Sequence, residues 1–378
     1  MFFKDIEGKH QLKTVLIKSV DTGRIPHAQL FLSREGAGGL PVALALASYI
    51  MCENRLPNDS CGTCSHCRKS HKYIHPDIHY SFPVVRQGDK KRESTTSDDF
   101  LPKWRTILDQ NPFMGKSDWF DFINEHNSTP NINTKECVDI MHKLNMKAYE
   151  SDKKILIMWL PEYLGNEGNR LLKLIEEPTD NTFIILVSEN QEQILQTILS
   201  RCQLIKIPPF TNADIVNYLG NNMNISSEKA EQIAHLADGN LNLAMAISNN
   251  QQADYSHLII SWLRVAYKSD PLEINQWIKE VDGLNKEEQK SFLEYGLHFF
   301  RQFNFRLLTH SDNIHLTQSE KEVAKNMEKV IDINKAEVIC MIINELVEYI
   351  PRNINLKIAL YADTLKIGKI LKNQIPVT

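Results

Sequence analysis

The amino-acid sequence predicts an α/β domain followed by an all-α region, and two observations support that prediction. Over the first two hundred residues, short apolar runs alternate with helical stretches, which is typical of a parallel sheet with helices on both faces. From residue 251 to the end, apolar residues recur at helical spacing. A length of 378 residues fits two or three domains.

Five segments are predicted to be strands because each is rich in apolar, β-branched or aromatic residues. An apolar helix over Leu40–Met51 is expected directly after the first strand. The predicted strands are His27–Leu32, Asp77–Phe82, Lys154–Trp159, Thr182–Val187 and Gln203–Ile207.

The alternating pattern is interrupted between about residues 84 and 134. Residues 86–99 are polar and charged, and tryptophan and phenylalanine residues follow in a separate segment. We expect an insertion with short helices around Phe100–Leu108 and Trp119–Asn124. Because it is long for a plain loop, it is either an elaboration of the fold or partly disordered. Its role does not follow from the sequence.

Pro208 and Pro209 mark the predicted end of the first domain, since neither residue continues a central strand. Three short helices are expected next, and Thr211 caps the first of them. These helices run over about 211–221, from 226 onward, and over 240–248. The predicted domains are therefore 1–208, a small helical domain at 209–250 and a larger helical domain at 251–378.

Composition argues against several classes of protein. Lys and Arg number 43 against 47 Asp and Glu, so the net charge is −4, whereas a protein that binds nucleic acid alone relies on excess positive charge. No apolar run approaches the roughly 18 residues of a membrane span, and the N-terminus lacks a secretory signal pattern. Seven cysteines, four of them clustered, favour a metal site in a reducing compartment over disulfides. We therefore expect a cytoplasmic protein.

The clustered cysteines are the strongest local signal in the chain. A gap of two residues lets consecutive thiolates turn toward one cation, and four thiolates at about 2.3 Å complete a tetrahedral zinc shell. Since every ligand is sulfur, the expected zinc ion is structural. An iron–sulfur cluster and unligated core cysteines are the alternatives, and His66 and His71 are alternative ligands nearby. The spacing is C-x8-C-x2-C-x2-C, formed by Cys52, Cys61, Cys64 and Cys67.

A glycine-containing turn at residues 33–40 resembles a phosphate-binding loop, whose pattern is G-x-x-x-x-G-K-[ST]. Ser33 replaces the first glycine, Gly39 stands at the lysine position, and Leu40 stands at the hydroxyl position. Pro41 then removes an N–H that would help to bind an anion. The loss of the cation, the magnesium ligand and one donor predicts that the chain has no ATPase activity. By itself, the segment also fits an ordinary turn.

The metal-holding acid of such folds follows an apolar strand. After Lys154–Trp159 the first acidic residue is Glu162, which is off the expected position. We expect Glu162 to cap a short helix instead. A second part of the hydrolytic site is therefore missing.

Ser200, Arg201 and Cys202 join a short helix to the last predicted strand. An arginine at a strand edge can act across a subunit boundary as an arginine finger, and a locally paired surface arginine is the alternative.

Glu176 and Glu177 end a predicted helix, where negative charge is disfavoured by about 0.3–1 kcal/mol. A cation is expected beside these two carboxylates, either from the same fold or from a partner. The alternative, which is equally compatible with the sequence, is a pair of surface carboxylates without a neighbouring cation.

Taken in order, these motifs resemble the delta-prime subunit family of the bacterial DNA polymerase III clamp loader, within the AAA+ superfamily. Specific motifs carry the resemblance over about residues 20–250. The remainder of the chain resembles the family only in its expected helical architecture. The matching segments are His27–Phe31, the degenerate loop with Gly36, Gly38, Gly39 and Leu40, the four cysteines, His75–Asp77, Leu171–Pro178 and Leu199–Cys202.

The resemblance implies an AAA+-type domain with a zinc knuckle at 52–67, a helical lid and a helical collar that joins subunits. It implies a non-hydrolytic stator that helps to load the sliding clamp onto primed DNA beside tau/gamma and delta subunits. Arg201, with Ser200 and Cys202, would then act in trans on a neighbour's ATP. Asn242 stands where the lid usually carries a nucleotide-sensing arginine, which agrees with an inert site.

Two other functions are weighed against this one. An active tau/gamma-like ATPase would need the Lys/Thr pair that Gly39 and Leu40 replace. A zinc-containing DNA-binding module would need a basic face near the cysteines, and Arg68, Lys69 and Lys72 form only a modest patch. Subunit order, stoichiometry, the role of the insertion, residual nucleotide binding and direct DNA contacts do not follow from the sequence.

Overall fold

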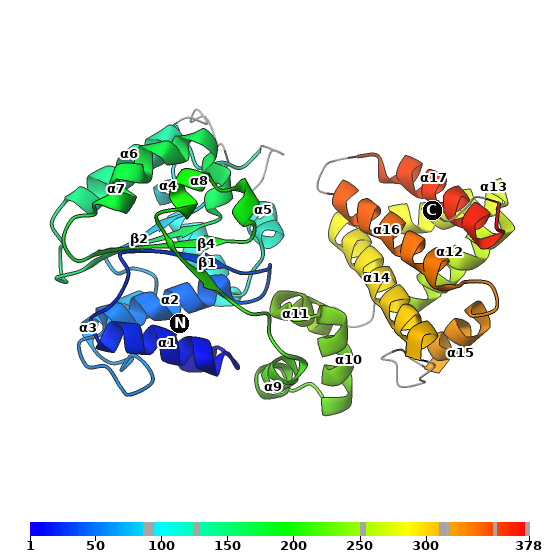
Figure 1. Ribbon diagram of the computed structural model, residues 1–378, viewed down its shortest axis with the longest axis horizontal. Helices are drawn as coiled ribbons and strands as arrows, with labels where there is room; N and C mark the ends of the chain where they lie inside the picture. The colour runs from blue at the N-terminus through cyan, green and yellow to red at the C-terminus, as the bar shows by residue number, and fades with distance from the viewer. Residues whose placement is uncertain are drawn as a thin grey trace. The chain divides into compact units, whose positions relative to one another are not determined.

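Five strands form one parallel sheet in the computed structural model of the protein (Figure 1). The strand order is β2-β3-β4-β1-β5, and every pair of neighbours is parallel. All five strands predicted from the sequence are confirmed, and no end differs by more than one residue. Their bounds are β1 (Ala28–Leu32), β2 (Ile78–Ser81), β3 (Lys154–Trp159), β4 (Thr182–Ser188) and β5 (Gln203–Lys206).

The structure describes residues 1–85, 94–123, 129–249, 255–309, 316, 318–350 and 354–374. The chain divides into two units, Met1–Asn249 and Asn250–Thr378. Each unit has a hydrophobic core of its own. The division of the first unit at residue 208 stays a prediction.

Alternate residues of the central strands serve two separate hydrophobic layers, as the two-residue period of a strand requires. Ile155 and Ile157 of β3 pack on the side of α1 (His10–Asp21) and α2 (Gly39–Met51). Leu156 and Met158 pack on the opposite side. That side is covered by α6 (Thr134–Asn145), α7 (Leu172–Glu176) and α8 (Gln196–Leu199). The sheet is therefore buried on both faces, as predicted.

Helix α2 is buried along its whole length, which explains why its sequence is apolar on all sides. It begins directly after the glycine-containing turn and ends at Met51, directly before Cys52. The short helix α3 (Ser65–His71) follows. This part of the chain also contains 3-10 helices at Phe3–Asp5, Pro161–Leu171 and Gln191–Gln193.

The insertion leaves the sheet after β2 and is closed at its base by a two-residue bridge. Val84 and Asn131 exchange backbone N–H···O bonds at 3.0 Å in both directions. Between them lie α4 (Ser97–Gln110), which contains the predicted helix Phe100–Leu108, and α5 (Lys116–Ile123). Helix α5 covers the predicted helix Trp119–Asn124 up to Ile123, and Asn124 lies outside the described residues. Trp104 and Trp119 are fully buried and pack in T-shaped geometry at 5.2 Å. Residues 94–123 thus form a packed elaboration, while 86–93 and 124–128 lie outside the described residues.

Three helices follow β5, as predicted. Thr211 and Asp214 form a capping box at the start of the first of them. Their bounds are α9 (Asn212–Met223), α10 (Ser227–Ala237) and α11 (Leu241–Asn249).

The second unit is all-α in the residues described. Its core contains the stacked rings of Trp262 and Trp277, whose centroids are 5.2 Å apart. Within the described ranges, no helix has the length and hydropathy that crossing a bilayer requires. The helices are α12 (Ser256–Lys268), α13 (Pro271–Asp282), α14 (Lys286–Thr309), α15 (Gln318–Met327), α16 (Ile333–Tyr349) and α17 (Leu356–Leu371).

Candidate functional site

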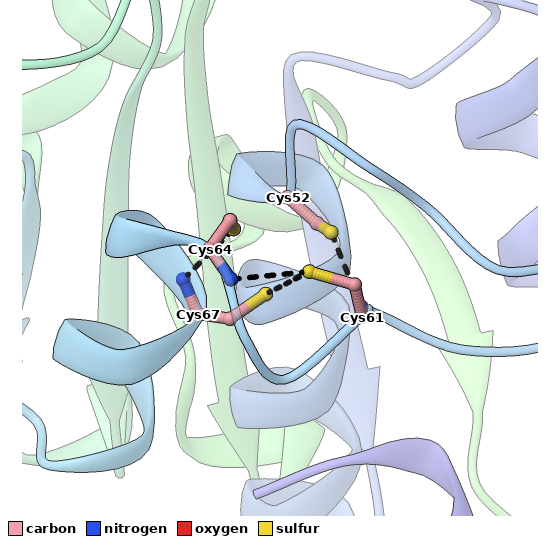
Figure 2. Close-up of side chains that lie close together, drawn as sticks. All are labelled: Cys52, Cys61, Cys64 and Cys67. Carbon is pink, nitrogen blue, oxygen red and sulfur yellow. Dashed lines mark hydrogen bonds between the residues drawn. The ribbon is translucent and has the colours of Figure 1, made fainter.

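The four clustered cysteines lie together where α2 ends and α3 begins, as Figure 2 shows. Their sulfur atoms lie within 4.8 Å of one another, and Sγ of Cys61 is 3.8 Å from Sγ of Cys67. A tetrahedral shell with metal–sulfur bonds of about 2.3 Å has sulfur–sulfur separations of about 3.8 Å. The structure therefore brings the predicted ligands together in an arrangement that can bind a metal ion such as zinc.

Backbone N–H groups point at three of the sulfur atoms. The N–H of Cys61 donates to Sγ of Cys52 at 3.3 Å, and the N–H of Cys64 donates to Sγ of Cys61 at 3.3 Å. The N–H of Cys67 donates to Sγ of Cys64 at 3.4 Å. Gly62 has φ +73°, a conformation that glycine adopts without strain and that turns these amides inward. Such donors stabilise thiolates, the form in which cysteine binds a metal.

The thiols differ in how their surroundings affect ionisation. Burial raises the pKa of Cys52 and of Cys67. Burial also opposes ionisation of Cys61, but backbone N–H groups of Cys64 and Thr63 outweigh it and lower the pKa of Cys61 to about 6. A bound cation would supply the charge that the buried thiolates need.

The two histidines considered as alternative ligands have other partners. Nδ1 of His66 lies 2.7 Å from Nε2 of His75. His71 stacks on Phe2 with ring centroids 5.0 Å apart, and its Nδ1 is 3.0 Å from the amino group of Met1. The cysteines alone therefore make up the candidate shell.

The predicted degenerate phosphate loop does form the turn between β1 and α2. Gly36 and Gly38 have φ of +67° and +84°, so the backbone needs glycine at both positions. A Cβ atom added to Gly39 would lie 2.3 Å from Oγ of Ser33. Leu40 is buried, with 3% of its surface exposed. The positions that hold the lysine and hydroxyl of a phosphate loop thus face the protein core.

Side chains from other elements lie against this turn. The ring of Phe210 packs on Gly38, and the ammonium of Lys9 lies 4.0 Å from the centroid of that ring. Burial lowers the pKa of Lys9 to about 8, although Asp214 partly opposes the effect. The backbone N–H of Leu241 donates to the carbonyl of Gly36 at 3.1 Å. The start of α11 is therefore attached directly to the loop.

The insertion contacts α11 and the α9 region beside the loop. Nδ2 of Asn111 donates to Oδ1 of Asn242 at 2.6 Å, and Nδ2 of Asn242 donates to Oδ2 of Asp118 at 2.7 Å. The ring of Phe113 meets Phe210 at 5.9 Å, and it meets Tyr218 on α9 at 5.6 Å. The sequence indicated only that Asn242 replaces a nucleotide-sensing arginine, whereas in the structure this residue links α11 to the insertion. Sequence reasoning missed its partners because no local pattern joins them.

The prediction that Glu162 caps a short helix is wrong. Leu160 is the N-cap of the 3-10 helix that contains Glu162, and it makes no side-chain cap. Oε1 of Glu162 instead accepts hydrogen bonds from Ser188 Oγ at 2.7 Å and from the backbone N–H of Glu189 at 2.6 Å and of Asn190 at 2.8 Å. Glu162 therefore holds the turn that follows β4.

Glu189 is part of this turn, and only 16% of its side chain is exposed. Burial raises the pKa of Glu189 to about 7, and the neighbouring Glu35 and Glu162 add to the effect. Lys116, whose Nζ is 3.5 Å from Oε2 of Glu189, partly offsets it.

Arg201 is the cation expected beside the acidic helix end. Its Nε donates to Oε1 of Glu176, and its Nη1 donates to the carbonyl of Thr197 at 2.8 Å and to Oγ of Ser200 at 3.1 Å. The side chains of Arg201 and Glu176 are 34% and 45% exposed, so the pair contributes at most about 1 kcal/mol to stability. Within the described residues, Nη2 of Arg201 has no hydrogen-bond partner. Cys202 follows it and is partly buried.

The chain is similar to subunits of DNA polymerase III. The family described as "DNA polymerase III, delta subunit" matches residues 8–211. The delta' subunit of DNA polymerase III from Bacillus subtilis is 25% identical over 247 residues, which cover 65% of this chain and 61% of that protein. The delta' subunit from Escherichia coli is 22% identical over 283 residues, covering 74% and 70%. The tau subunit from E. coli is 23% identical over 252 residues, covering 65% of this chain and 32% of that protein.

Proposed function

The chain belongs to the DNA polymerase III delta subunit family, and on that premise we propose that it is a non-hydrolytic clamp-loader subunit. It braces neighbouring subunits while they hydrolyse ATP, and it helps to place a sliding clamp on primed DNA. The phosphate loop is the observation that carries this proposal. Gly39 and Leu40 replace the lysine and hydroxyl, and Ser33 occupies the space into which a side chain at position 39 would extend.

Nucleotide binding by the isolated chain tests the absence of hydrolysis. We expect no binding of Mg·ATP in calorimetric titrations at micromolar concentrations, and no phosphate release by the purified chain. An active ATPase subunit is the second candidate, because the tau relative matches 65% of this chain. Micromolar affinity for ATP would favour that candidate and overturn the first.

We propose that Arg201 acts in trans on the ATP of an adjacent subunit. It precedes β5, which is an edge strand of the sheet and pairs with β1. In the described part of the chain, the outer edge of β5 pairs with no other strand of this sheet, and Leu204 on β5 is 44% exposed, so this edge is accessible to another chain. Glu176 holds one side of the guanidinium, and the unpaired Nη2 is available to an external phosphate oxygen. The pair orients the arginine before the partner arrives.

Steady-state ATPase measurements on the reconstituted complex test this role. Arg201→Ala should lower DNA-dependent hydrolysis by about 10³-fold at the site that faces it. Arg170→Ala is the matched control, because Arg170 is also an exposed arginine paired with a nearby glutamate, Glu167. Equal rates for Arg201→Ala and the wild-type complex would eliminate the finger.

We also propose that the four cysteines bind one structural zinc ion. The all-sulfur donor set and the 3.8 Å separation between Cys61 and Cys67 support zinc. Elemental analysis should give one zinc per chain, and removal of the metal should lower the melting temperature. Visible absorption bands from bound iron would instead indicate an iron–sulfur cluster.

The proposed partners are tau/gamma and delta subunits, with the clamp and primed DNA as indirect partners in the cytoplasm. The helices of the second unit would serve as the collar that joins subunits. A separate DNA-binding role for the cysteine region has less support, because Lys69 is already paired with Glu150. This pairing leaves Arg68 and Lys72 as the remaining cations of the modest patch.

A further inference from the structure

Two buried histidines form a chain of contacts beside the cysteine cluster. Nε2 of His75 lies 2.7 Å from Nδ1 of His66, and Nε2 of His66 lies 3.2 Å from Oε1 of Glu53. His75 is 3% exposed and His66 is 8% exposed. We propose that these three residues form a hydrogen-bond relay that positions the cysteines, and that they do not form a second metal site. The positioning role rests on the proposed zinc site.

The contacts of His75 determine which nitrogen of each ring carries a proton. The backbone N–H of Asp77 donates to Nδ1 of His75 at 3.1 Å. Nδ1 must therefore present a lone pair, which leaves the proton of the neutral ring on Nε2. His75 then donates to Nδ1 of His66, and the proton of His66 is on Nε2, where it faces the carboxylate of Glu53. One direction of donation satisfies every contact.

The same reasoning argues against a metal ion between the histidines. Glu150 lies close enough to complete a set of three donors with His66 and His75. A histidine that binds a metal usually donates its other ring N–H to an acceptor. Nδ1 of His75 faces a donor instead, so its Nε2 cannot offer a lone pair while the ring is neutral. Glu150 is also already paired with Lys69.

The relay connects the two segments that carry the cysteines. Glu53 directly follows Cys52, and His66 lies on α3 between Cys64 and Cys67. Figure 2 shows that these cysteines come from separate stretches of backbone. The relay therefore fixes the end of α2 against α3.

The far end of the relay is anchored in the turn before β2. The carboxylate of Asp77 accepts hydrogen bonds from the backbone N–H groups of Tyr149, Glu150 and Ser151. The amide of Asp77 in turn holds His75. The relay thus connects the cysteine segments to the edge of the sheet at β2. Mutation of side chains that surround a metal shell typically lowers metal affinity about 10–100-fold.

Zinc release into excess chelator, followed with a coloured indicator, tests the relay on the full chain. His75→Ala should release zinc at least about 10-fold faster than the wild type. His75→Gln keeps an N–H donor near the position of Nε2 and should stay close to the wild type. His142→Ala, which changes an exposed histidine on α6, is the matched control.

Nitrogen-15 spectra of the histidine rings report which ring nitrogen carries the proton. They are recorded on the wild-type chain, so this test does not require any variant to fold. The wild-type chain should show both His66 and His75 as Nε2–H tautomers. An Nδ1–H tautomer at either ring, or release by His75→Ala at the wild-type rate, would overturn the relay. Two zinc ions per wild-type chain and one in His75→Ala would show a second metal site. A wild-type chain without any zinc would refute the zinc proposal and the positioning role together, while the spectra would still judge the hydrogen bonds.

Discussion

Glu189 shows how the surroundings of one residue set its chemistry. It follows β4 and lies close to Glu162 and to Glu35, a residue of the phosphate-loop turn. Because it is buried and close to like charges, the pKa of Glu189 rises from 4.5 to about 7. The folded protein therefore binds a proton more tightly here than the unfolded chain does. Stability should fall as the pH rises between 4.5 and 7 and level off above 7.

Glu189→Gln should remove this loss. At pH 8 the variant should be more stable than the wild type by at most about 3 kcal/mol, because it has no charge to bury. Near pH 4 the two should be equal, since Glu189 is then protonated. Urea unfolding at both pH values measures the difference, with the exposed Glu192→Gln as control. A pH-independent difference would contradict the assignment.

Among the elements, the turn between α4 and α5 has the clearest structural role. Asn111 and Phe113 of this turn, together with Asp118 in the first turn of α5, contact the phosphate-loop region and α11. These contacts hold α11 against the α/β part of the first unit.

Asn242→Ala should loosen this contact without unfolding the chain. The change removes the two hydrogen bonds that Asn242 makes and leaves Asn111 and Asp118 without those partners, so we expect a loss of about 1–3 kcal/mol. Hydrogen exchange should become faster in α11 and in residues 111–118 before it changes in α2. Asn222→Ala on α9 removes an exposed side-chain hydrogen bond and serves as control. If exchange became faster to the same extent in α11, in residues 111–118 and in α2, or if Asn222→Ala had the same effect as Asn242→Ala, the contact would not be a local restraint.

Phe113→Ala should have a larger effect on the same contact. Phe113 is 2% exposed and packs against Phe210 and Tyr218. Removal of a buried phenylalanine ring typically costs about 3–5 kcal/mol. Chemical denaturation of the first unit measures this loss, and a change below about 1 kcal/mol would show that the ring is not part of a packed core.

At the scale of the whole molecule, the two units have separate cores. The first unit is built around the sheet, and the second is built around Trp262, Trp277 and the phenylalanines of α14. A core that is complete within one unit does not need the other for folding.

Fragments 1–249 and 255–378 should therefore each fold alone. Each fragment should show one cooperative thermal transition, and the second should retain a near-ultraviolet circular dichroism signal from the Trp262–Trp277 stack. The intact chain provides the reference spectrum. A fragment with helical content but no cooperative transition would contradict independent folding.

The sequence by itself determined the strands, the main helices and the loss of the lysine and hydroxyl from the phosphate loop. It also placed the four cysteines at metal-binding spacing. Each of these features is local, because strand and helix periods and the reach of a thiolate depend on neighbours a few positions away.

Only the tertiary structure decided which distant groups meet. Asn111 and Asn242 are 131 positions apart, and Arg201 lies 25 positions from Glu176. The true role of Glu162 and the contacts of the insertion depend equally on the path of the chain across the sheet. Such contacts carry no periodic signal, since the geometry that joins them exists only once the strands have taken their order.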